Sequence, residues 1–551
     1  MKKINTRSAK IKIAILTLII GGVVSAFKAD YFEVNKQLEL FTGVFKEVNL
    51  YYVDETEPGQ LMENAMNGML KSLDPYTVFI PESDVEDFRI IQTGQYGGIG
   101  STIRRVGDKI LIADPHEGFP ADKAGLRAGD WIKSVDGINM VGKSSDEVSR
   151  ILKGTPGSEV ELTYERDGKE TTLTLKREEI QLKSVPYYGM INENTGYIYL
   201  SSFTDKASKE VKEALLELKK DPNFTQVIFD LRGNPGGLLN ESVNIANLFI
   251  EKGTEVVSTK GRLKEVDNTY KTLRAAIDTE IPLAILINSG SASASEIVAG
   301  TIKDLDRGIV VGQRSYGKGL VQQQHPLQYG SQVKITIAKY YTPSGRCIQA
   351  INYAERAEDG SVKRVPDSLR TEFKTKNGRS VYDGGGVDPD LEIPAEEAAG
   401  ILVSLANAGH LFDYATIYVR EHDQIAPAGS FSLSDAEYQK FVHYLSDKHY
   451  EYTTDTEKSI EKLKKIAEGE DFSGLKGDLA ALEEKTKKLK NDDLMRHKDQ
   501  ITTYLEQEIA GRYFYQAGSI RQSLKGDPIV EAAVKTLNDK NAYNEILAIA
   551  K

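Results

Sequence analysis

Apolar and polar positions follow four different patterns along the chain. Residues 31–95 repeat apolar side chains every three or four positions and predict helices. Residues 96–180 carry short β-like runs separated by Asp-Gly and Pro-Gly turns, with one helix predicted over 145–152. Residues 186–395 alternate strand and helix patterns, which indicates an α/β layer fold. Residues 396–551 are rich in Lys, Glu, Ala and Leu and predict a helical domain.

The α/β stretch contains strongly apolar strand patterns over 197–200, 227–231 and 283–287. Each is followed by a loop and a helical pattern. Two further runs, 308–311 and 333–338, are expected to continue the same sheet. Ligands of open α/β sheets gather at the carboxyl ends of the strands, so the loops after these strands are the first places to look for a site.

The first residues have the pattern of an export signal. Lysines and an arginine precede an apolar run over 13–24, and small residues follow it. The run is shorter than the roughly 20 residues that span a bilayer comfortably. We therefore expect residues 1–28 to be a signal peptide or an uncleaved membrane anchor. The expected location of the protein is therefore the periplasm or cell envelope. A buried N-terminal helix is the alternative, and the one-sided basic flank argues against it.

Composition narrows the class of partner. The chain has 551 residues and a net charge of −11, so it has no general electrostatic reason to bind nucleic acid. Cys347 is the single cysteine of the sequence. It cannot form an intramolecular disulfide, and the sequence has no cysteine cluster for zinc. We expect no metal site.

A serine and a lysine stand out as candidates for chemistry. Ser293 lies in a small-residue stretch between a strand and a helix, where backbone N–H groups can stabilise an oxyanion. A serine needs a base, and no histidine has a suitable context. Lys318, between two glycines, can serve if its pKa is lowered. Two plainer interpretations remain: Ser293 and Glu296 form a helix capping box, and Lys318 is a surface turn residue.

The segment 287–324 resembles the carboxyl-terminal processing and tail-specific protease family. That family carries a Ser-Ala-Ser-Ala-Ser-Glu stretch and a Gly-Lys-Gly 25 residues after the nucleophile. The same spacing here selects Ser293 over its neighbours Ser291 and Ser295 and pairs it with Lys318. The resemblance runs from about residue 41 to 393.

The resemblance implies a multidomain α/β protein with a crotonase-like protease core. The expected organisation is a signal or anchor over 1–28, a helical region over 29–95, a PDZ domain over 96–180, the serine protease core over 181–395 and a helical domain over 396–551. The charged faces of the last domain are most simply solvated surface. Binding of an activator or adaptor, or self-association, is the sharper alternative.

Supporting positions follow from the same resemblance. Gln322, four residues after Lys318, would share its face of a strand and orient the amine. Asp304 matches an acidic position near the lysine. The loop 230–237 resembles the family's Asp-Leu-Arg-x-Asn-x-Gly-Gly, which implies an oxyanion hole formed by Gly236 or Gly237 with Ala294. The alternatives are that Gln322 is an ordinary polar strand residue, that Asp304 is a carboxylate on a helix surface, and that the loop 230–237 is a plain turn.

The PDZ assignment rests on residues 96–100, Tyr-Gly-Gly-Ile-Gly, and on the Gly-Asp-rich motif over 124–137. PDZ domains bind a C-terminal peptide as an added strand and hold its carboxylate with loop N–H groups. The expected peptide-binding residues are Gly97, Gly98, Ile99 and Gly100 in the loop, and Val148, Ile151 and Leu152 in the apolar groove, although some of these must belong to the core.

Together these features predict a serine endopeptidase that recognises protein substrates by apolar C-termini and needs no metal or organic cofactor. Ser293 would attack and Lys318 would carry the proton through an acyl-enzyme. A catalytically inactive PDZ scaffold and a small-ligand-binding protein are the alternatives. An intact Ser293, Lys318, Gln322 and 230-loop argue against the scaffold, and copurification of an apolar ligand would favour the third.

Overall fold

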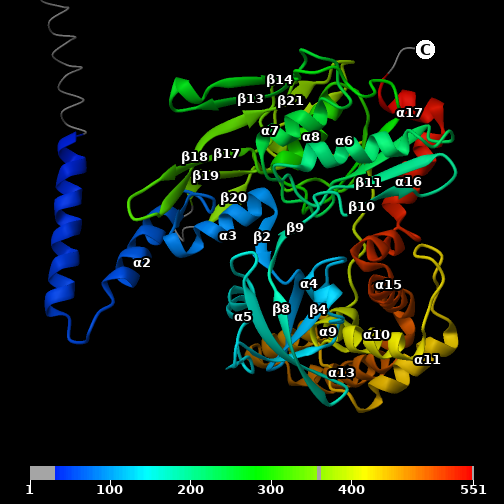
Figure 1. The fold of residues 1–551 in the computed structure, drawn as a ribbon. Helices are drawn as coiled ribbons and strands as arrows, with labels where there is room; N and C mark the ends of the chain where they lie inside the picture. Colours follow the sequence, from blue (N-terminus) through cyan, green and yellow to red (C-terminus); the bar gives the residue numbers. More distant parts are fainter. Residues whose placement is uncertain (1–30, 357–360, 549–551) are drawn as a thin grey trace, which may run out of the picture.

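The computed structural model describes residues 31–356 and 361–548. The predicted export signal lies outside these residues. The α/β region expected to be the protease core, called the protease body below, lies above the expected PDZ domain and most of the C-terminal helices in Figure 1, and a helix over residues 31–51 stands away from it. In the described part of the chain, no helix is both long and apolar enough to cross a membrane.

The N-terminal region is helical with one strand inserted. Helix α2 (Pro58–Lys71) is followed by strand β1 (Val78–Ile80) and helix α3 (Glu82–Thr93). The helical prediction for 31–95 missed β1, because three residues carry no readable period. β1 pairs antiparallel with a strand of the protease body, so this region is fixed to that body.

The PDZ domain has the strands and the helix that the pattern predicts. Its sheet has the order β3-β4-β5-β7-β8, with β6 at the side of β5. Ile110, Ile132, Val148 and Leu162 are fully buried between this sheet and helix α5. The elements are β2 (Gln95–Gly98), β3 (Ser101–Val106), β4 (Lys109–Pro115), α4 (Pro120–Lys123), β5 (Trp131–Val135), β6 (Ile138–Asn139), α5 (Ser145–Leu152), β7 (Glu159–Arg166), β8 (Lys169–Lys176) and β9 (Glu178–Gln181).

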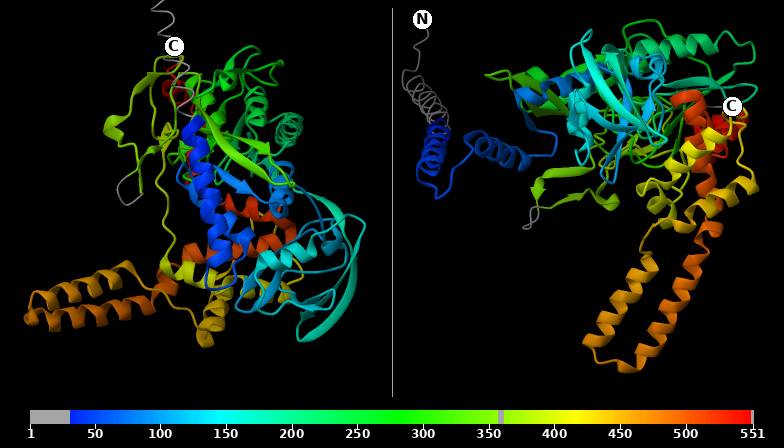
Figure 2. Two further views of the ribbon diagram at one scale, coloured as in Figure 1. Left: turned by 90° about the vertical axis from the view of Figure 1, so that its left-hand side faces the viewer. Right: turned by 60° about the horizontal axis from the view of Figure 1, so that its bottom comes forward.

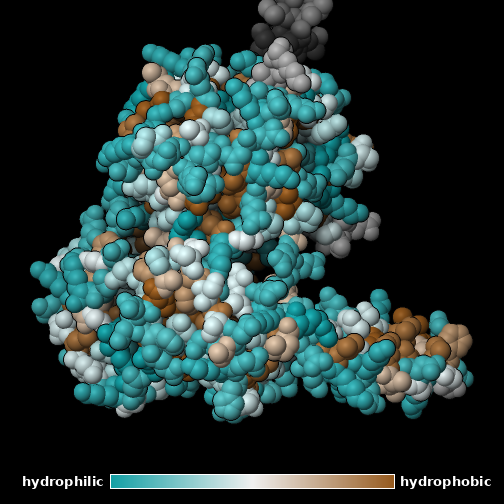
Figure 3. Space-filling view, turned by 90° about the vertical axis from the view of Figure 1, so that its right-hand side faces the viewer, coloured by the Kyte–Doolittle hydropathy of each residue, from teal (hydrophilic) through white to brown (hydrophobic). Residues whose placement is uncertain are grey.

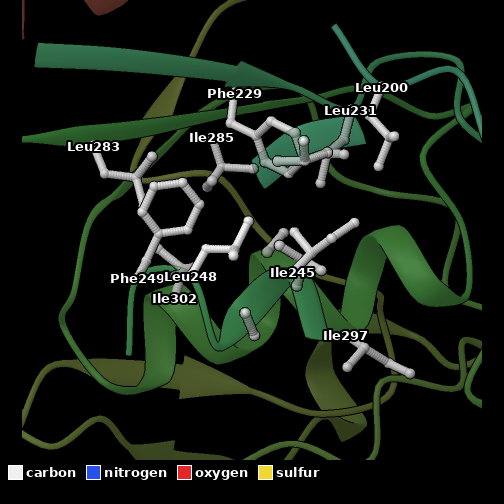
Figure 4. Close-up of a cluster of buried hydrophobic side chains, with 14 of the residues drawn as sticks. Leu200, Phe229, Leu231, Ile245, Leu248, Phe249, Leu283, Ile285, Ile297 and Ile302 are labelled. Carbon is white, nitrogen blue, oxygen red and sulfur yellow. The ribbon is translucent and has the colours of Figure 1, made fainter. Parts of the chain in front are cut away.

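The protease body is built on a six-stranded sheet of order β10-β11-β12-β15-β16-β23, parallel from β11 onward. Helices α6, α7 and α8 cover one face, where apolar side chains of sheet and helices interdigitate (Figure 4). The elements are β10 (Tyr187–Met190), β11 (Thr195–Tyr199), α6 (Ala207–Leu218), β12 (Gln226–Asp230), α7 (Leu239–Ala246), β15 (Leu283–Ile287), α8 (Ala294–Asp304), β16 (Ile309–Gly312) and β23 (Leu391–Glu392).

A second sheet lies beside the first. Its order is β1-β18-β13-β14, and β17 pairs with β18 as a hairpin. The prediction that residues 333–338 continue the parallel sheet is therefore wrong: their alternating polar pattern belongs to a half-exposed antiparallel strand. The elements are β13 (Glu255–Gly261), β14 (Asn268–Lys271), β17 (Leu320–Pro326) and β18 (Gln332–Tyr341), with small hairpins β19 (Ile351–Arg356)–β20 (Val362–Arg364) and β21 (Glu372–Lys374)–β22 (Ser380–Tyr382).

The C-terminal region is helical, as predicted, but it is not one separate unit. Its last helices, α16 and α17, pack on the second face of the protease sheet, where Val530, Ala533 and Tyr543 meet Ile228 and Leu286. The elements are α9 (Gly400–Asn407), α10 (His410–Glu421), α11 (Asp435–Tyr444), α12 (Asp455–Gly469), α13 (Lys476–Asn491), α14 (Asp493–Arg496), α15 (Lys498–Ser523), α16 (Pro528–Asn538) and α17 (Lys540–Ile546).

Helices α12 and α13 form an arm that projects from the molecule (Figure 2). Ile460 and Leu479 are buried where the two helices meet. Leu463, Leu482 and Leu489 remain about half exposed, and the arm shows brown apolar patches in Figure 3.

The PDZ domain rests on helices α10 and α15. Arg420 pairs with Asp167 at 2.6 Å, and the Tyr515 hydroxyl donates to Asp122 at 3.1 Å. A cavity of about 660 Å³ lies between the two domains.

Candidate active site

Ser293 lies beyond the carboxyl end of strand β15, directly before helix α8. Its backbone has φ 57° and ψ −113°, a conformation that residues with a Cβ rarely adopt. The Ser293 N–H donates to Glu296 Oε2 at 2.8 Å. Strained backbone of this kind persists only where the surroundings hold it, and it gathers at functional sites.

Glu296 is the group that joins the serine loop to the lysine loop. Its side chain is fully buried and accepts hydrogen bonds from Ser315 Oγ (2.5 Å), Gly317 N (2.7 Å) and Lys318 N (2.9 Å), besides the one from Ser293. Burial raises the pKa of this carboxyl, and the four donors act against that rise. The capping interpretation of Glu296 was too narrow, since three of its donors lie on another loop.

Lys318 is half buried beside Ser293. Burial lowers the pKa of its amine to about 8, with a smaller lowering by Lys334, while Glu296 and Asp74 act in the opposite direction. The Tyr340 hydroxyl lies 3.0 Å from Ser293 O and 2.6 Å from Lys318 O, so it also holds the two backbones together.

The lysine amine has an aromatic neighbour. Lys318 Nζ lies 4.4 Å from the centroid of the Tyr76 ring. Within the described residues, no hydrogen bond joins Nζ to the Ser293 hydroxyl in this structure. An amine whose pKa lies near 8 can be neutral in a useful fraction of molecules at neutral pH, as a general base requires.

The glycine loop after β12 packs directly on the serine. Gly236 has φ 100°, and a Cβ there would lie 2.8 Å from Ser293 Cβ and 2.9 Å from Ala294 N. Its own N–H donates to Asn234 Oδ1 at 2.8 Å. Among the described residues, the N–H groups of Gly237 and Ala294 have no protein acceptor. Of Gly236 and Gly237, it is therefore Gly237 whose N–H can donate to a ligand.

The acidic and basic residues of the same loop anchor it. Asp230 pairs with Arg232 at 2.6 Å and accepts from the Tyr197 hydroxyl at 2.6 Å. Arg232 also pairs with Asp527 at 2.6 Å, just before α16. The loop beside Ser293 is thus tied to the far end of the chain.

Two predicted supporting residues lie elsewhere than expected. Lys318 precedes β17, and the register shifts between Val321 and Gln322, so the period-two argument for a shared face fails. Gln322 Nε2 instead donates to Thr336 Oγ1 at 3.2 Å. The buried Asp304 carboxylate pairs with Arg346 at 2.8 Å rather than with Lys318, and so fixes the loop after β18.

The predicted peptide-binding residues of the PDZ domain are mostly internal. Ile99, Val148 and Leu152 are buried in the domain core, and Ile151 is the partly exposed member of the groove set. Gly97 and Gly98 lie on β2, which pairs with β9, and Gly97 O accepts from Gly154 N at 3.0 Å. Gly100 has φ 70° and lies against Phe119. Of the predicted loop residues, Gly97 lines a cavity of about 500 Å³ together with Tyr96, Arg150 and Lys153, so an opening remains beside β2 and the end of α5.

Sequence reasoning left Tyr76 and Tyr340 out of the site. Tyr340 begins the segment Tyr-Tyr-Thr-Pro-Ser-Gly-Arg, and Tyr76 ends the segment Ser-Leu-Asp-Pro-Tyr; both read as turns and neither pattern points to chemistry. No local pattern could place Tyr76 beside a lysine 242 positions away. In the part of the chain that the structure describes, no cluster of three or more His, Cys, Asp or Glu residues could hold a metal ion.

Comparisons with known proteins identify the family and the domains of the chain. Residues 194–355 match the model of peptidase family S41, residues 97–176 a PDZ domain, and residues 401–537 the "Probable PDZ-protease, C-terminal helical domain". A carboxy-terminal-processing protease of Bartonella bacilliformis is 37% identical over 386 residues, which cover 67% of this chain and 88% of that protein.

Two further relatives are similar over shorter or looser matches. A protein of Staphylococcus aureus named "Probable CtpA-like serine protease" is 37% identical over 58% of this chain and 64% of its own length. The solved photosystem II D1 C-terminal processing protease is 28% identical, with a TM-score of 0.36, over 68% of this chain and 96% of its own.

An α/β core with a serine at the head of a buried helix, preceded by a PDZ domain, defines a PDZ-containing serine peptidase. The chain belongs to peptidase family S41, the family of the carboxy-terminal-processing proteases.

Proposed function

We propose that this peptidase captures protein substrates by apolar C-termini through its PDZ domain and cleaves them with a Ser293–Lys318 pair. Ser293 Oγ attacks the scissile carbonyl carbon while neutral Lys318 takes its proton. The ammonium then protonates the leaving amine as the C–N bond breaks and an acyl-enzyme remains, which water hydrolyses by the reverse proton path. Gly237 and Ala294 N–H groups receive the oxyanion.

The observation that carries the proposal is the Glu296 network. One buried carboxylate accepts from both Ser293 N and Lys318 N, at 2.8 and 2.9 Å. This arrangement holds a serine and a lysine of lowered pKa on adjoining loops, and a passive helix cap would not need it. A scaffold with a decayed site would have no reason to keep it.

The test is cleavage of an unfolded protein with an apolar C-terminus by wild type, Ser293→Ala and Lys318→Ala. We expect both variants to lose at least 10³-fold in kcat/KM while keeping the wild-type thermal unfolding curve. Substantial turnover by either folded variant would refute the pair. A charged C-terminus on the same substrate should raise KM if the PDZ domain recruits it.

The pH dependence gives a second, independent readout. A lysine base is active only when neutral, so kcat/KM should rise with pH through about 8, the pKa to which burial lowers Lys318. A limb near 6.5 would instead indicate a histidine.

We further propose that the chain is exported and works in the periplasm or cell envelope. The basic and apolar pattern over residues 1–28 supports this address. Fractionation of cells expressing the full chain or a chain lacking residues 2–28 tests it. Equal cytoplasmic recovery of both would contradict export.

For residues 396–551 we propose a role in binding an activator or a second copy of the chain. Its support is the projecting α12–α13 arm with its half-exposed leucines. Light scattering of wild type and of Leu463→Ser/Leu482→Ser measures self-association. If the variant has the same molar mass in solution as wild type and the same proteolytic activity with an activator present, the arm has neither of the two proposed roles.

A further inference from the structure

A turn from the N-terminal region forms part of the lysine's surroundings. Asp74 is buried and accepts from Tyr76 N and Thr77 N, each at 2.8 Å, so its side chain shapes the turn between α2 and β1. β1 then pairs with β18, with Val78 opposite Lys334. Thr77 Oγ1 accepts from Thr336 N at 3.1 Å, which fixes the turn to the strand beside the site.

Tyr76 is held at its far end by other tyrosines. Its hydroxyl lies 3.3 Å from the Tyr316 hydroxyl and 3.5 Å from that of Tyr353. The Tyr76 and Tyr353 rings meet edge to face, with centroids 6.0 Å apart. The ring therefore has a fixed orientation, and the face of that ring lies against Lys318 Nζ at 4.4 Å.

The lysine itself has little else to hold it. Its four-carbon stem is flexible, and Nζ has no hydrogen bond or ion pair with a protein group in the described residues. An aromatic face attracts an ammonium group within about 6 Å of its centroid. Contact with the Tyr76 ring is thus the interaction that selects a position for the amine.

We propose that Tyr76 is the positioning residue for Lys318. During the reaction, the ammonium form of Lys318 lies against the face of the Tyr76 ring. This inference rests on the proposed role of Lys318 as the base. The proton leaves Ser293 Oγ for Nζ and later goes from Nζ to the leaving amine. Between these two transfers the lysine is charged, and the ring stabilises it at that stage.

The groups that face the amine allow the contribution of the ring to be separated. Lys334 on β18 disfavours the charged form, whereas Glu296 on α8 and Asp74 in the turn favour it. Tyr316 and Tyr353 contact the Tyr76 hydroxyl at the far end of the ring, and the Tyr340 hydroxyl lies against Lys318 O. Tyr76→Leu removes the π face and leaves these groups in place, and Tyr76→Phe keeps the face and removes only the hydroxyl.

The first experiment does not depend on activity. In a Ser293→Ala background, the acetylation rate of Lys318 by acetic anhydride is followed against pH by mass spectrometry, with exposed Lys339 as internal reference. We expect Tyr76→Leu to lower the apparent pKa of Lys318 by about half a unit to one unit, because a cation–π contact is lost. Tyr76→Phe should leave it unchanged, as should the exposed control Tyr188→Leu.

The second experiment uses the Ser293-containing enzyme. We expect Tyr76→Leu to lower kcat about 10-fold with KM unchanged, and Tyr76→Phe to stay within about 3-fold of wild type. If Tyr76→Leu is unfolded by circular dichroism, Tyr76→Met replaces it. Identical titration of Lys318 in the Leu (or Met) and Phe variants, or equal kcat for them, would overturn the proposal. Turnover by Ser293→Ala would instead refute the catalytic pair and leave the titration result standing.

Discussion

At the scale of single residues, the site depends on the buried Glu296 carboxyl, which has no cationic partner at hydrogen-bond distance among the described residues. Glu296 is stabilised by four donors, three of them backbone N–H groups, at 2.5 to 2.9 Å. Hydrogen bonds to a buried ionised group are stronger than neutral ones, and losing them leaves the donors unsatisfied. The same carboxylate sets the positions of Ser293 and Lys318, so its loss should affect stability and catalysis together.

Glu296→Gln tests this dual role. The amide NH₂ would face N–H donors, and we expect a loss of about 2–4 kcal/mol in the free energy of unfolding and at least 10²-fold in kcat. Urea unfolding and steady-state kinetics measure the two effects. The matched control is Glu147→Gln. Glu147 belongs to a second Ser-x-x-Glu capping box, which lies at the exposed start of α5. If both variants show the same small decrease in the free energy of unfolding and in kcat, Glu296 is only a helix cap.

At the scale of elements, the glycine loop after β12 must approach the start of α8 closely. Gly236 provides the contact, since a Cβ there would lie 2.7 Å from Ala292 O and 2.8 Å from Ser293 Cβ. Positive φ explains why glycine is favoured at 236, and the steric contact links this position to Ser293.

Gly236→Ala should therefore push the loop and the helix start apart. We expect kcat/KM to fall about 10²-fold, because small displacements of reacting groups cost this much. Gly233→Ala is the control: it lies in the same loop with φ 68°, but its Cβ would meet no atom within 4 Å. Both variants should lose about 1–2 kcal/mol of stability from the backbone. Equal activity in the two variants would show that the contact is irrelevant to the nucleophile.

The elements also show how far the sequence alone reaches. The strand at 283–287 and the helix at 145–152 have the predicted bounds, because long apolar or periodic runs decide their own conformation. Residues 333–338 were correctly a strand but were assigned to the wrong sheet, since period fixes conformation and not the partner strand. Ser293 and Lys318 were named from a motif. The position of Tyr76 beside Lys318 depends on the pairing of β1 with β18, and no local sequence pattern predicts this pairing.

At the scale of the whole molecule, the end of the chain completes the protease body. Helices α16 and α17 cover the sheet face opposite α6–α8, and Arg232 of the glycine loop after β12 pairs with Asp527. Asp527 also caps α16 by accepting from Ile529 N at 2.9 Å and Val530 N at 3.2 Å. One carboxylate thus fixes a helix and, through Arg232, the loop beside Ser293.

Asp527→Ala separates these two functions when compared with Asp539→Ala. Asp539 caps α17 in the same way, accepting from Asn541 N and Ala542 N at 3.0 and 3.1 Å, and pairs with no cation among the described residues. Each variant should lose about 1 kcal/mol of stability from the cap. Asp527→Ala should lose a further 1–3 kcal/mol and several-fold in kcat, because Arg232 keeps only Asp230 as a partner. Chemical denaturation and kinetics measure both. If the two variants have the same kcat, the C-terminal helices stabilise the protease body without influencing the position of the glycine loop beside Ser293.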